Sequence, residues 1–525
     1  MYVPILRMQP GKIEADTKSY LYLDPGRFLK RAASLWDPSV AMGTLSHQTI
    51  GYLFPMGPYY WLMSEIGVPA WVSQRLWLAT MILAAGYGMR YLLRTLGVDG
   101  PGIGVAMVAF AFTPYVLGYT SIYSALLLPW AALPWWLGYS ERALHRDAWK
   151  YAALFAITVQ IVGSVNGSSL AFALIGPLLW VLHAAVFRRT TWPRVWAITW
   201  RTGLLTFLTS LWWFIPLLIE GKYGVNILRF TESTQAVAAT SQPYEILRGL
   251  GNWYFYGTDR LGAWVDARPY YTQRVGFVFI SYLVPALALV AAAFVRWRHR
   301  AYFVVLTFVA MVIAVGAAPY NHPSLLGGVY KNLALHRNVV FAFRNVGRVM
   351  PLLSVSIAAI LGVAVSSFFR RMRALDHAFI GVTAAGLVFA VCIVNAYPAL
   401  AGAYYTKALE YSKIPTYWRQ AIAKMDSEPH STRVLALPGS DFASYRWGDT
   451  REPIEPGLMS RPYVARELVA WGTAPTVNLL RSLDERVQES SLDPRALAPM
   501  ARLMGVGDVE IRSDLEGDKY SLVGP

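Results

Sequence analysis

Charge and cysteine are both scarce in this chain. Of its 525 residues only 15% are Asp, Glu, Lys or Arg, whereas soluble domains have about a quarter. Hydrophobic residues make up 55%, and the mean hydropathy is +0.37. The single cysteine, Cys392, lies in an apolar run, which excludes a disulfide within the chain and argues against a thiolate metal site. The composition therefore predicts an integral membrane protein.

Common chemical motifs are missing as well. No Walker loop, paired-glycine fingerprint, HExxH or zinc-ligand spacing appears in a supporting context. Ser440 in LPGSD does not form a GxSxG nucleophile elbow. The apolar runs hold almost no ionisable residue, which argues against an ion-coupled transporter, because such proteins keep charged side chains inside the membrane. No motif requires a cofactor, although a divalent cation could support anion binding.

Apolar runs long enough to cross a membrane recur along the chain. About ten are found, at residues 71–89, 102–119, 122–139, 149–165, 170–187, 202–219, 276–295, 302–318, 350–369 and 377–397. Lys and Arg gather in every second connection, which places those connections in the cytoplasm. The other connections, 1–70, 220–275 and 319–348, and the tail from about residue 398 then lie outside. Since this puts residue 1 outside, either the chain starts outside or a first helix is missing before Met1, and we expect the second.

The net charge of +16 is largely a topology signal, and we expect no nucleic-acid partner. The basic cytoplasmic face is expected to contact anionic membrane lipids, and an acidic protein could also dock there.

The first outer loop offers Glu14, Asp16, Asp24 and Asp37 as candidate acids. Asp24-Pro25 predicts an N-cap with proline at the first helical position, and Asp37-Pro38 closes that helix. Asp16 has no such local role, so it is the best candidate in this loop for a catalytic base. A solvated turn is the alternative for Asp16.

The other two outer loops supply candidate binding residues. The second is too long for a mere connector and places aromatic rings beside acids. We assign sugar binding to Trp253, Tyr254 and Tyr256 and to Tyr52 of the first loop, with an interfacial aromatic belt as the alternative. The third loop is basic although it lies outside, where the positive-inside rule predicts few Lys and Arg residues. This positive charge favours binding of an anion such as a lipid phosphate. Its cations are Lys331, His336, Arg337, Arg344 and Arg348. Pairing with carboxylates of the other loops is the alternative.

From about Lys407 the composition becomes that of a soluble domain. Residues 411–425 predict an amphipathic helix, 433–440 a buried strand and turn, and 501–515 a helix end, a glycine turn and a strand. These elements predict a small α/β domain over residues 401–525 on the outer face, beside a membrane domain of residues 1–400.

Several long segments are familiar together. They are DTKSYLYLDPGRFLKRAASLWDP, HQTIGYLFPMGPYYWL, GVPAWVSQRLW, FAFRNVGRVMPLL and RVLALPGSDFASYRWG. From about Gly11 onward the chain resembles the amino-terminal membrane region of the arabinofuranosyltransferase D family of actinobacterial cell-wall enzymes. Chains of that family are longer, with carbohydrate-binding modules after the membrane region, so we expect a short homologue or a fragment.

The resemblance implies a mainly α, polytopic GT-C glycosyltransferase fold with ten to eleven transmembrane helices. It also implies a multi-pass protein of the plasma membrane with its active site outside the cytoplasm. The donor would be polyprenyl-phosphate (decaprenyl-phosphate) arabinofuranose. The acceptor would be the arabinan of arabinogalactan or lipoarabinomannan, and the product an α-(1→3) linkage formed with inversion.

The resemblance also implies residue roles. Asp16 matches the catalytic acid that follows the first helix in GT-C enzymes. Glu232 in RFTES matches a glutamate of the second outer loop that is implicated in the family, and we expect this second catalytic residue to orient the acceptor or assist the base. We expect Asp16 to act as general base and the third-loop cations, Arg344 and Arg348 above all, to hold the donor phosphate. The alternatives are another polyprenyl-phosphate sugar transferase such as a mannosyltransferase, a flippase for lipid-linked sugars, and a non-catalytic scaffold.

Overall fold

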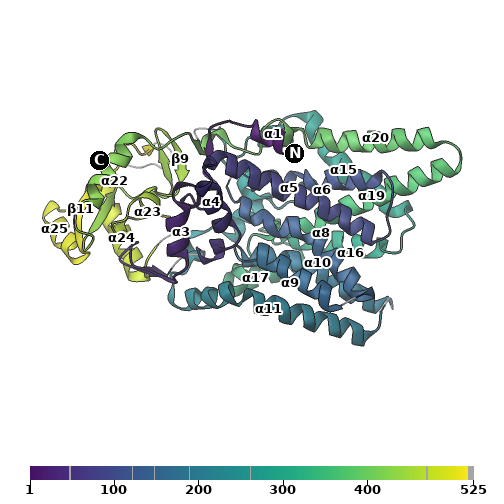
Figure 1. The fold of residues 1–525 in the computed structure, drawn as a ribbon, viewed down its shortest axis with the longest axis horizontal. Helices are drawn as coiled ribbons and strands as arrows, with labels where there is room; N and C mark the ends of the chain where they lie inside the picture. Colours follow the sequence, from purple (N-terminus) through teal and green to yellow (C-terminus); the bar gives the residue numbers. More distant parts are fainter. Residues whose placement is uncertain are drawn as a thin grey trace.

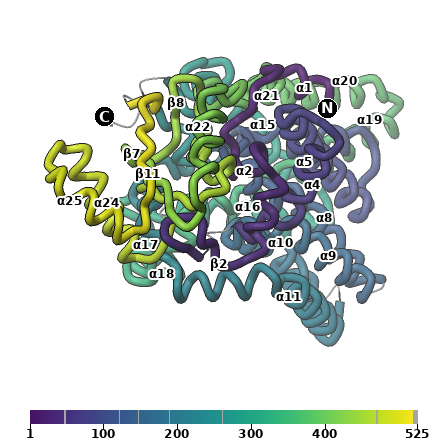
Figure 2. The backbone as a smooth tube through the Cα atoms, turned by 60° about the vertical axis from the view of Figure 1, so that its left-hand side comes forward, coloured from purple at the N-terminus to yellow at the C-terminus, as the bar shows by residue number. Residues whose placement is uncertain are grey.

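A computed structural model gives the fold (Figure 1). It describes residues 1–45, 49–120, 122–146, 148–187, 190–259, 262–468 and 471–517. Long helices run side by side along the long axis of the molecule, and the C-terminal strands and short helices lie at one end. The first outer loop lies between these two parts, and the turned view in Figure 2 shows the same arrangement.

Each of the ten predicted spans coincides with a helix. They are α5 (Ala70–Thr95), α6 (Gly102–Ala111) with α7 (Pro114–Leu117), α8 (Leu128–His145), α9 (Ala148–Val162), α10 (Gly167–Val186), α11 (Trp192–Tyr223), α15 (Val275–Phe294), α16 (Arg300–Val315), α19 (Met350–Ala374) and α20 (Ala378–Asn395). Six of the described helices, in α5, α10, α11, α15, α19 and α20, are long and apolar enough to cross a membrane. In lipid, an apolar segment satisfies its backbone hydrogen bonds by forming a helix. These apolar helices make the chain a multi-pass membrane protein. The exact number of spans stays a prediction.

Helix α19 forms the centre of this bundle. In its most apolar stretch 72% of the residues are buried, against 17% in α11, which faces outward. Glycines let α19 approach α6 closely: a Cβ on Gly102 would lie 1.9 Å from the carbonyl oxygen of Gly362. Small residues at helix contacts are typical of membrane bundles, where packing replaces the hydrophobic driving force.

The first outer loop is folded into short elements. They are α1 (Tyr2–Leu6), β1 (Ile13–Glu14), α2 (Tyr20–Leu23), α3 (Pro25–Ala32), β2 (Trp36–Asp37), β3 (Thr44–Leu45), η1 (Ile50–Leu53) and α4 (Met56–Glu65). The predicted cap is confirmed, since Asp24 Oδ1 accepts a hydrogen bond from Arg27 N at 2.9 Å. The helix ends before Asp37, because the Ser34 hydroxyl donates to the Trp36 carbonyl at 2.9 Å and favours a turn.

The described residues of the other two loops form short helices and a pair of short antiparallel strands. The second loop has η3 (Ile227–Phe230), α12 (Thr234–Thr240), α13 (Pro243–Leu247), η4 (Trp253–Tyr256), β4 (Thr258–Asp259), β5 (Gly262–Ala263) and α14 (Arg268–Thr272). The third has α17 (Leu325–His336), α18 (Asn338–Phe341) and η5 (Val346–Val349).

The C-terminal part mixes strands and helices, as predicted. Its elements are α21 (Tyr397–Leu400), η6 (Lys407–Leu409), β6 (Glu410–Tyr411), α22 (Thr416–Asp426), β7 (Arg433–Leu437), β8 (Ala443–Tyr445), β9 (Gly448–Arg451), α23 (Glu455–Leu458), β10 (Tyr463–Val464), α24 (Ala474–Gln488), α25 (Pro494–Leu503) and β11 (Val506–Ile511). One sheet is parallel in the order β10-β7-β11, and another is antiparallel in the order β1-β6-β9-β8. Strand β1 comes from the first outer loop, so the two regions share a sheet. The division at residue 400 stays a prediction.

Candidate active site

The segment around Asp16 is fixed on both sides by backbone hydrogen bonds. Strand β1 pairs with β6, and Ala15 N donates to Leu409 O at 2.8 Å. On the other side Thr17 N donates to Ile122 O at 2.8 Å. Thr17 has a φ of +47°, a left-handed conformation that costs energy for a β-branched residue. The backbone therefore holds the Asp16 side chain in one direction.

The Asp16 carboxylate is buried against the start of the 3₁₀ helix η2 (Ser124–Leu127), which leads into α8. Its Oδ1 accepts a hydrogen bond from Ser124 N at 2.9 Å, and its Oδ2 accepts one from Ser124 Oγ. Asp16 is only 7% exposed, so the solvated-turn alternative is wrong. Burial raises the pKa of Asp16 from 3.8 to about 7, although the Ser124 hydrogen bonds and the charge of Arg451 oppose the shift. A carboxylate with this pKa suits general-base chemistry near neutral pH, while the same contacts also cap η2.

Two consecutive residues of the C-terminal part reach this segment, and sequence reasoning missed both. Glu452 accepts hydrogen bonds from Lys18 Nζ at 2.6 Å and Ser19 N at 2.9 Å. Arg451, at the end of β9, donates to the Tyr123 hydroxyl at 2.6 Å, beside the Ser124 that holds Asp16. No local sequence pattern predicts these contacts, because they join positions hundreds of residues apart.

The four predicted sugar-binding aromatics differ in position. The Arg451 guanidinium lies 5.9 Å from the centre of the Tyr254 ring, so Tyr254 lies near the Asp16 segment. Tyr52 lies there as well: burial raises its pKa to about 12, opposed by the charge of Lys18. Trp253 packs against the Tyr254 ring at 5.7 Å, and the Tyr256 hydroxyl donates to Glu245. The sugar-binding roles of all four stay predictions.

Glu232 lies in a polar cluster of the second and third outer loops. Its carboxylate contacts Arg344 Nη2 and Asn345 Nδ2, both at 3.3 Å, and its carbonyl accepts from Arg344 Nε at 3.0 Å. The Glu232 and Arg344 side chains are 12% and 7% exposed. Burial lowers the pKa of Arg344, and the charge of Glu232 opposes this shift. For Arg344 the pairing alternative is therefore confirmed.

Arg348 lies at the N-terminus of α10. Its Nη1 donates to Ser168 Oγ at 2.6 Å and to Asn166 Oδ1 at 3.3 Å, and Asn166 caps the helix by accepting from Ser169 N at 2.9 Å. Arg348 Nε and Ser169 Oγ are buried and have no hydrogen-bond partner among the described residues. A guanidinium beside a helix N-terminus is a favourable place for an anion.

The other predicted cations of the third loop lie on or beside α17. Lys331 Nζ donates to the Tyr320 carbonyl at 2.8 Å and lies 3.9 Å from the centre of the Tyr320 ring. His336 Nδ1 contacts the Asn332 carbonyl at 2.8 Å, and Arg337 is exposed. Within the described part of the chain, no hydrogen bond or ion pair joins these three residues to Arg344 or Arg348, and their role in phosphate binding stays a prediction.

The connection between α7 and η2 links the two halves of the site. Tyr119, at the start of this connection, is within electrostatic reach of both Arg348 and Glu232, and Ser124 at its end holds Asp16. Asn252 Nδ2 fixes the connection by donating to Gly118 O at 3.0 Å. In the described part of the chain, no three His, Cys, Asp or Glu side chains gather closely enough to hold a metal ion.

The fold and the site together define a polytopic helical membrane protein with a buried loop carboxylate, Asp16, and a separate polar cluster of Glu232 and Arg344. Comparison with known proteins gives the family. Residues 1–525 match the family described as alpha-(1->3)-arabinofuranosyltransferase, N-terminal GT-C domain. The chain therefore belongs to this family and has its GT-C fold.

Curated relatives and a solved structure agree with this assignment. The chain is 29% identical to an alpha-(1->3)-arabinofuranosyltransferase of Mycobacterium tuberculosis over 97% of its own length and 37% of the relative. It is 27% identical to that of Mycolicibacterium smegmatis, covering 97% and 36%. The cryo-EM structure of mycobacterial arabinofuranosyltransferase AftD matches with a TM-score of 0.78 and 25% identity, covering 100% of this chain and 35% of that one. The chain thus spans little more than a third of the length of these relatives.

Proposed function

We propose that this chain is the catalytic membrane domain of an arabinofuranosyltransferase. It would transfer arabinofuranose from a polyprenyl-phosphate donor to a cell-wall arabinan, forming an α-(1→3) linkage with inversion at the outer face of the plasma membrane. Family membership supports the reaction. The observation that carries the proposal is the buried Asp16, whose pKa of about 7 matches the need of a general base.

In the proposed reaction Asp16 accepts the proton of the acceptor hydroxyl. The hydroxyl oxygen attacks the anomeric carbon of the donor while the bond from that carbon to the phosphate oxygen breaks. Polyprenyl phosphate leaves from the opposite face with the bonding electrons, so the configuration at the anomeric carbon inverts. Arg348 and the N-terminus of α10 would stabilise the negative charge that develops on the phosphate.

Glu232 is better suited to a positioning role than to proton transfer. Both of its carboxylate oxygens already accept hydrogen bonds, one from Arg344 and the other from Asn345. We infer that Glu232 orients Arg344 toward the donor phosphate or a hydroxyl of the acceptor. No step of the proposal needs a metal, although a divalent cation could share the role of the arginines.

The test compares transfer of labelled arabinose to a synthetic arabinan by the wild-type protein and Asp16→Asn. We expect wild-type transfer and a loss of about a hundredfold or more in the variant, because a positioned base contributes about that much. Asp24→Asn is the matched control, since Asp24 caps a helix of the same loop. Equal activity of wild type and Asp16→Asn would exclude Asp16 as the base. Transfer of mannose instead of arabinose would exclude the proposed donor.

A further inference from the structure

Helix α17 of the third outer loop turns its large apolar side chains away from the protein. Four of them are exposed: Leu325 at 86%, Leu326 at 64%, Val329 at 54% and Leu333 at 44%. They share one side of the helix, because residues three or four apart are neighbours on an α-helix. The side that faces the protein carries the small residues Gly327 and Ala334, which are buried. The helix thus presents its most apolar side to its surroundings.

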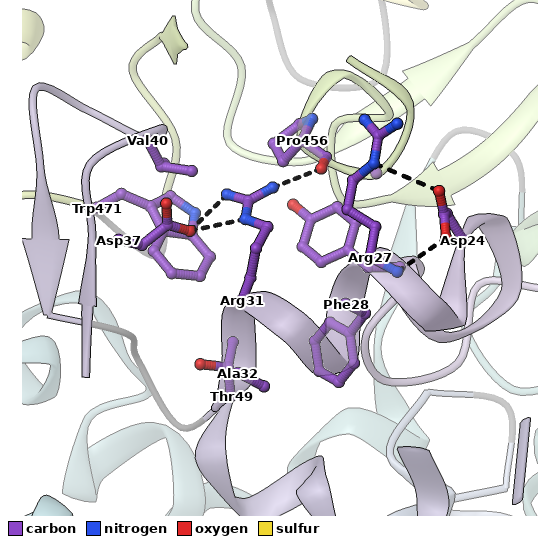
Figure 3. Close-up of a pocket in the computed structure, with 12 residues that line it drawn as sticks. Asp24, Arg27, Phe28, Arg31, Ala32, Asp37, Val40, Thr49, Pro456 and Trp471 are labelled. Carbon is purple, nitrogen blue, oxygen red and sulfur yellow. Dashed lines mark hydrogen bonds and ion pairs between the residues drawn. The ribbon is translucent and has the colours of Figure 1, made fainter. Parts of the chain in front are cut away.

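Helix α3 of the first outer loop, which is also amphipathic, shows the opposite arrangement (Figure 3). Its apolar residues Phe28 and Ala32 are buried in the protein, and its basic Arg31 pairs with Asp37 at 2.6 Å. An exposed apolar face such as that of α17 is unfavourable in water and marks contact with a membrane or with another protein. Two further features of α17 favour the membrane.

The first feature is the position of α17 at the end of an apolar helix. A Cβ on Gly327 would lie 2.5 Å from the carbonyl oxygen of Gly316, the residue that follows α16. The Tyr330 hydroxyl donates to the Arg344 carbonyl at 3.3 Å, in the segment that leads into the membrane-spanning helix α19. The exposed face of α17 therefore lies at the level where apolar helices end, which is the boundary between hydrocarbon and headgroups.

The second feature is the charge of the third outer loop. Residues 321–348 contain no Asp or Glu, while Lys331, His336 and Arg337 lie on or directly after α17. An apolar side flanked by basic residues is the pattern of a helix that lies in the membrane interface, where cations meet the phosphates of lipid headgroups. The charge and the apolar face thus fit the same surface.

We propose that α17 is an interfacial helix, with its exposed apolar face embedded in the lipid leaflet on the side of the candidate active site. His336 and Arg337 contact phospholipid headgroups, which gives them a role separate from the donor phosphate. Tyr330 ties the helix to Arg344, and Arg348 follows four residues later. A second part of the proposal rests on the proposed function: α17 holds these two arginines at the depth where a membrane-borne donor presents its phosphate.

The test places spin labels on single cysteines in protein reconstituted into lipid nanodiscs. Val329→Cys is compared with Leu335→Cys, which is similarly exposed at 58% but lies on another side of α17, since six residues make about 1.7 helical turns. Leu387→Cys on the span α20 is the lipid control, and Leu503→Cys on α25 is the water control. Unsubstituted protein is the blank, because its single cysteine, Cys392, is buried. Collisions of each label with oxygen, which concentrates in lipid, and with a water-soluble nickel chelate are measured.

We expect the Val329 label to collide with the chelate about tenfold less often than the Leu503 label, because the apolar face of an interfacial helix lies about 5–10 Å into the boundary of headgroups and acyl chains. Its collisions with oxygen should approach those of the Leu387 label, and the Leu335 label should meet the chelate more often than the Val329 label does. Chelate access at Val329 equal to that at Leu503 would overturn the proposal, since the face would then be in water. Protection from both reagents would also overturn it, because a second copy or another protein would then cover the face.

The consequence for the reaction is tested with Val329→Ser combined with Leu333→Ser. Both side chains are exposed, so the change leaves no cavity in the protein. We expect KM for a long-chain polyprenyl-phosphate donor to rise about tenfold with kcat nearly unchanged, because binding of the helix to lipid scales with its buried apolar area. Leu503→Ser is the control and should keep the wild-type KM. An unchanged KM in the double variant would overturn the placement of the two arginines by α17. Absence of transfer by the wild type would contradict the proposed function alone, since the labels report on the helix without any reaction.

Discussion

Replacing Asp16 by asparagine is expected to remove activity and, at the same time, to stabilise the fold at neutral and alkaline pH. Burial raises the pKa of Asp16 from 3.8 to about 7, so the ionised carboxylate is less stable in the folded protein than in the unfolded chain. Asparagine has nearly the same shape, can accept from Ser124 N, and has no charge to bury. The substitution therefore removes the free-energy cost of burying an ionised carboxylate.

The size and the sign of this effect follow from the linkage of protonation and folding. A shift from 3.8 to about 7 corresponds to about 4 kcal/mol at about 1.4 kcal/mol per pH unit. Between these pH values the folded state holds a proton that the unfolded state has released, so wild-type stability falls as pH rises. The gain of Asp16→Asn over wild type should be absent near pH 4, grow through pH 5 and 6, and reach about 4 kcal/mol above pH 7.

The measurement is thermal unfolding of purified wild type and Asp16→Asn in the same detergent and at the same scan rate, from pH 5 to pH 8. Asp37→Asn is the control: Asp37 pairs with Arg31 at 2.6 Å, so its loss should lower the unfolding temperature at neutral pH. An Asp16→Asn protein that is less stable than wild type at pH 8 would refute the reasoning. It would show that Asp16 mainly stabilises the fold by capping η2, and that its ionised carboxylate does not lower the stability of the folded protein.

Two further predictions concern the charges of the C-terminal part. Arg451→Gln should move the acidic limb of the pH profile of kcat/KM to higher pH, because the positive charge of Arg451 lowers the pKa of Asp16. The control is Arg446→Gln, since Arg446 is exposed. Identical profiles for the two variants would contradict this prediction. Arg512→Met should lower the free energy of unfolding by about 3–5 kcal/mol, because Arg512 and Glu455 form an ion pair at 3.3 Å with both side chains 0% exposed. Adding Glu455→Gln should restore much of that loss in a denaturation experiment, and a double variant as unstable as the single one would show that packing matters more than charge.

The sequence predicted the helices well because the rule that governs them is local. An apolar run in lipid must form a helix, so hydropathy alone locates α5, α10, α11, α15, α19 and α20. The cap at Asp24 is local too, since it joins residues three apart. The end of α3 was harder to predict from the sequence. The amphipathic pattern continues to Trp36, but the helix ends at Ala32, where the Ser34 hydroxyl competes for backbone hydrogen bonds.

Only some residues of the candidate site could be predicted from the sequence. Asp16 and Glu232 could be named by resemblance, and Asp16 also by the lack of a local role. Their partners could not be found this way, because Ser124 lies 108 residues from Asp16 in sequence and Arg451 lies 328 residues from Tyr123. A single sequence has no signal for contacts of that range. For the same reason it could not show that Arg344 is paired with Glu232 and that Arg348 lies at the start of α10.

The C-terminal part packs against the first outer loop and helps to bury Asp16. Exclusion of water raises the pKa of a carboxylate, whereas a loop between membrane helices is normally hydrated. Strand β6 pairs with β1 on one side of Asp16, and Glu452 fixes Lys18 and Ser19 on the other. The strands after residue 401 are therefore part of the cover that dehydrates Asp16. A region that looks like a separate soluble domain in the sequence thus sets the acidity of a group more than 390 residues earlier in the chain.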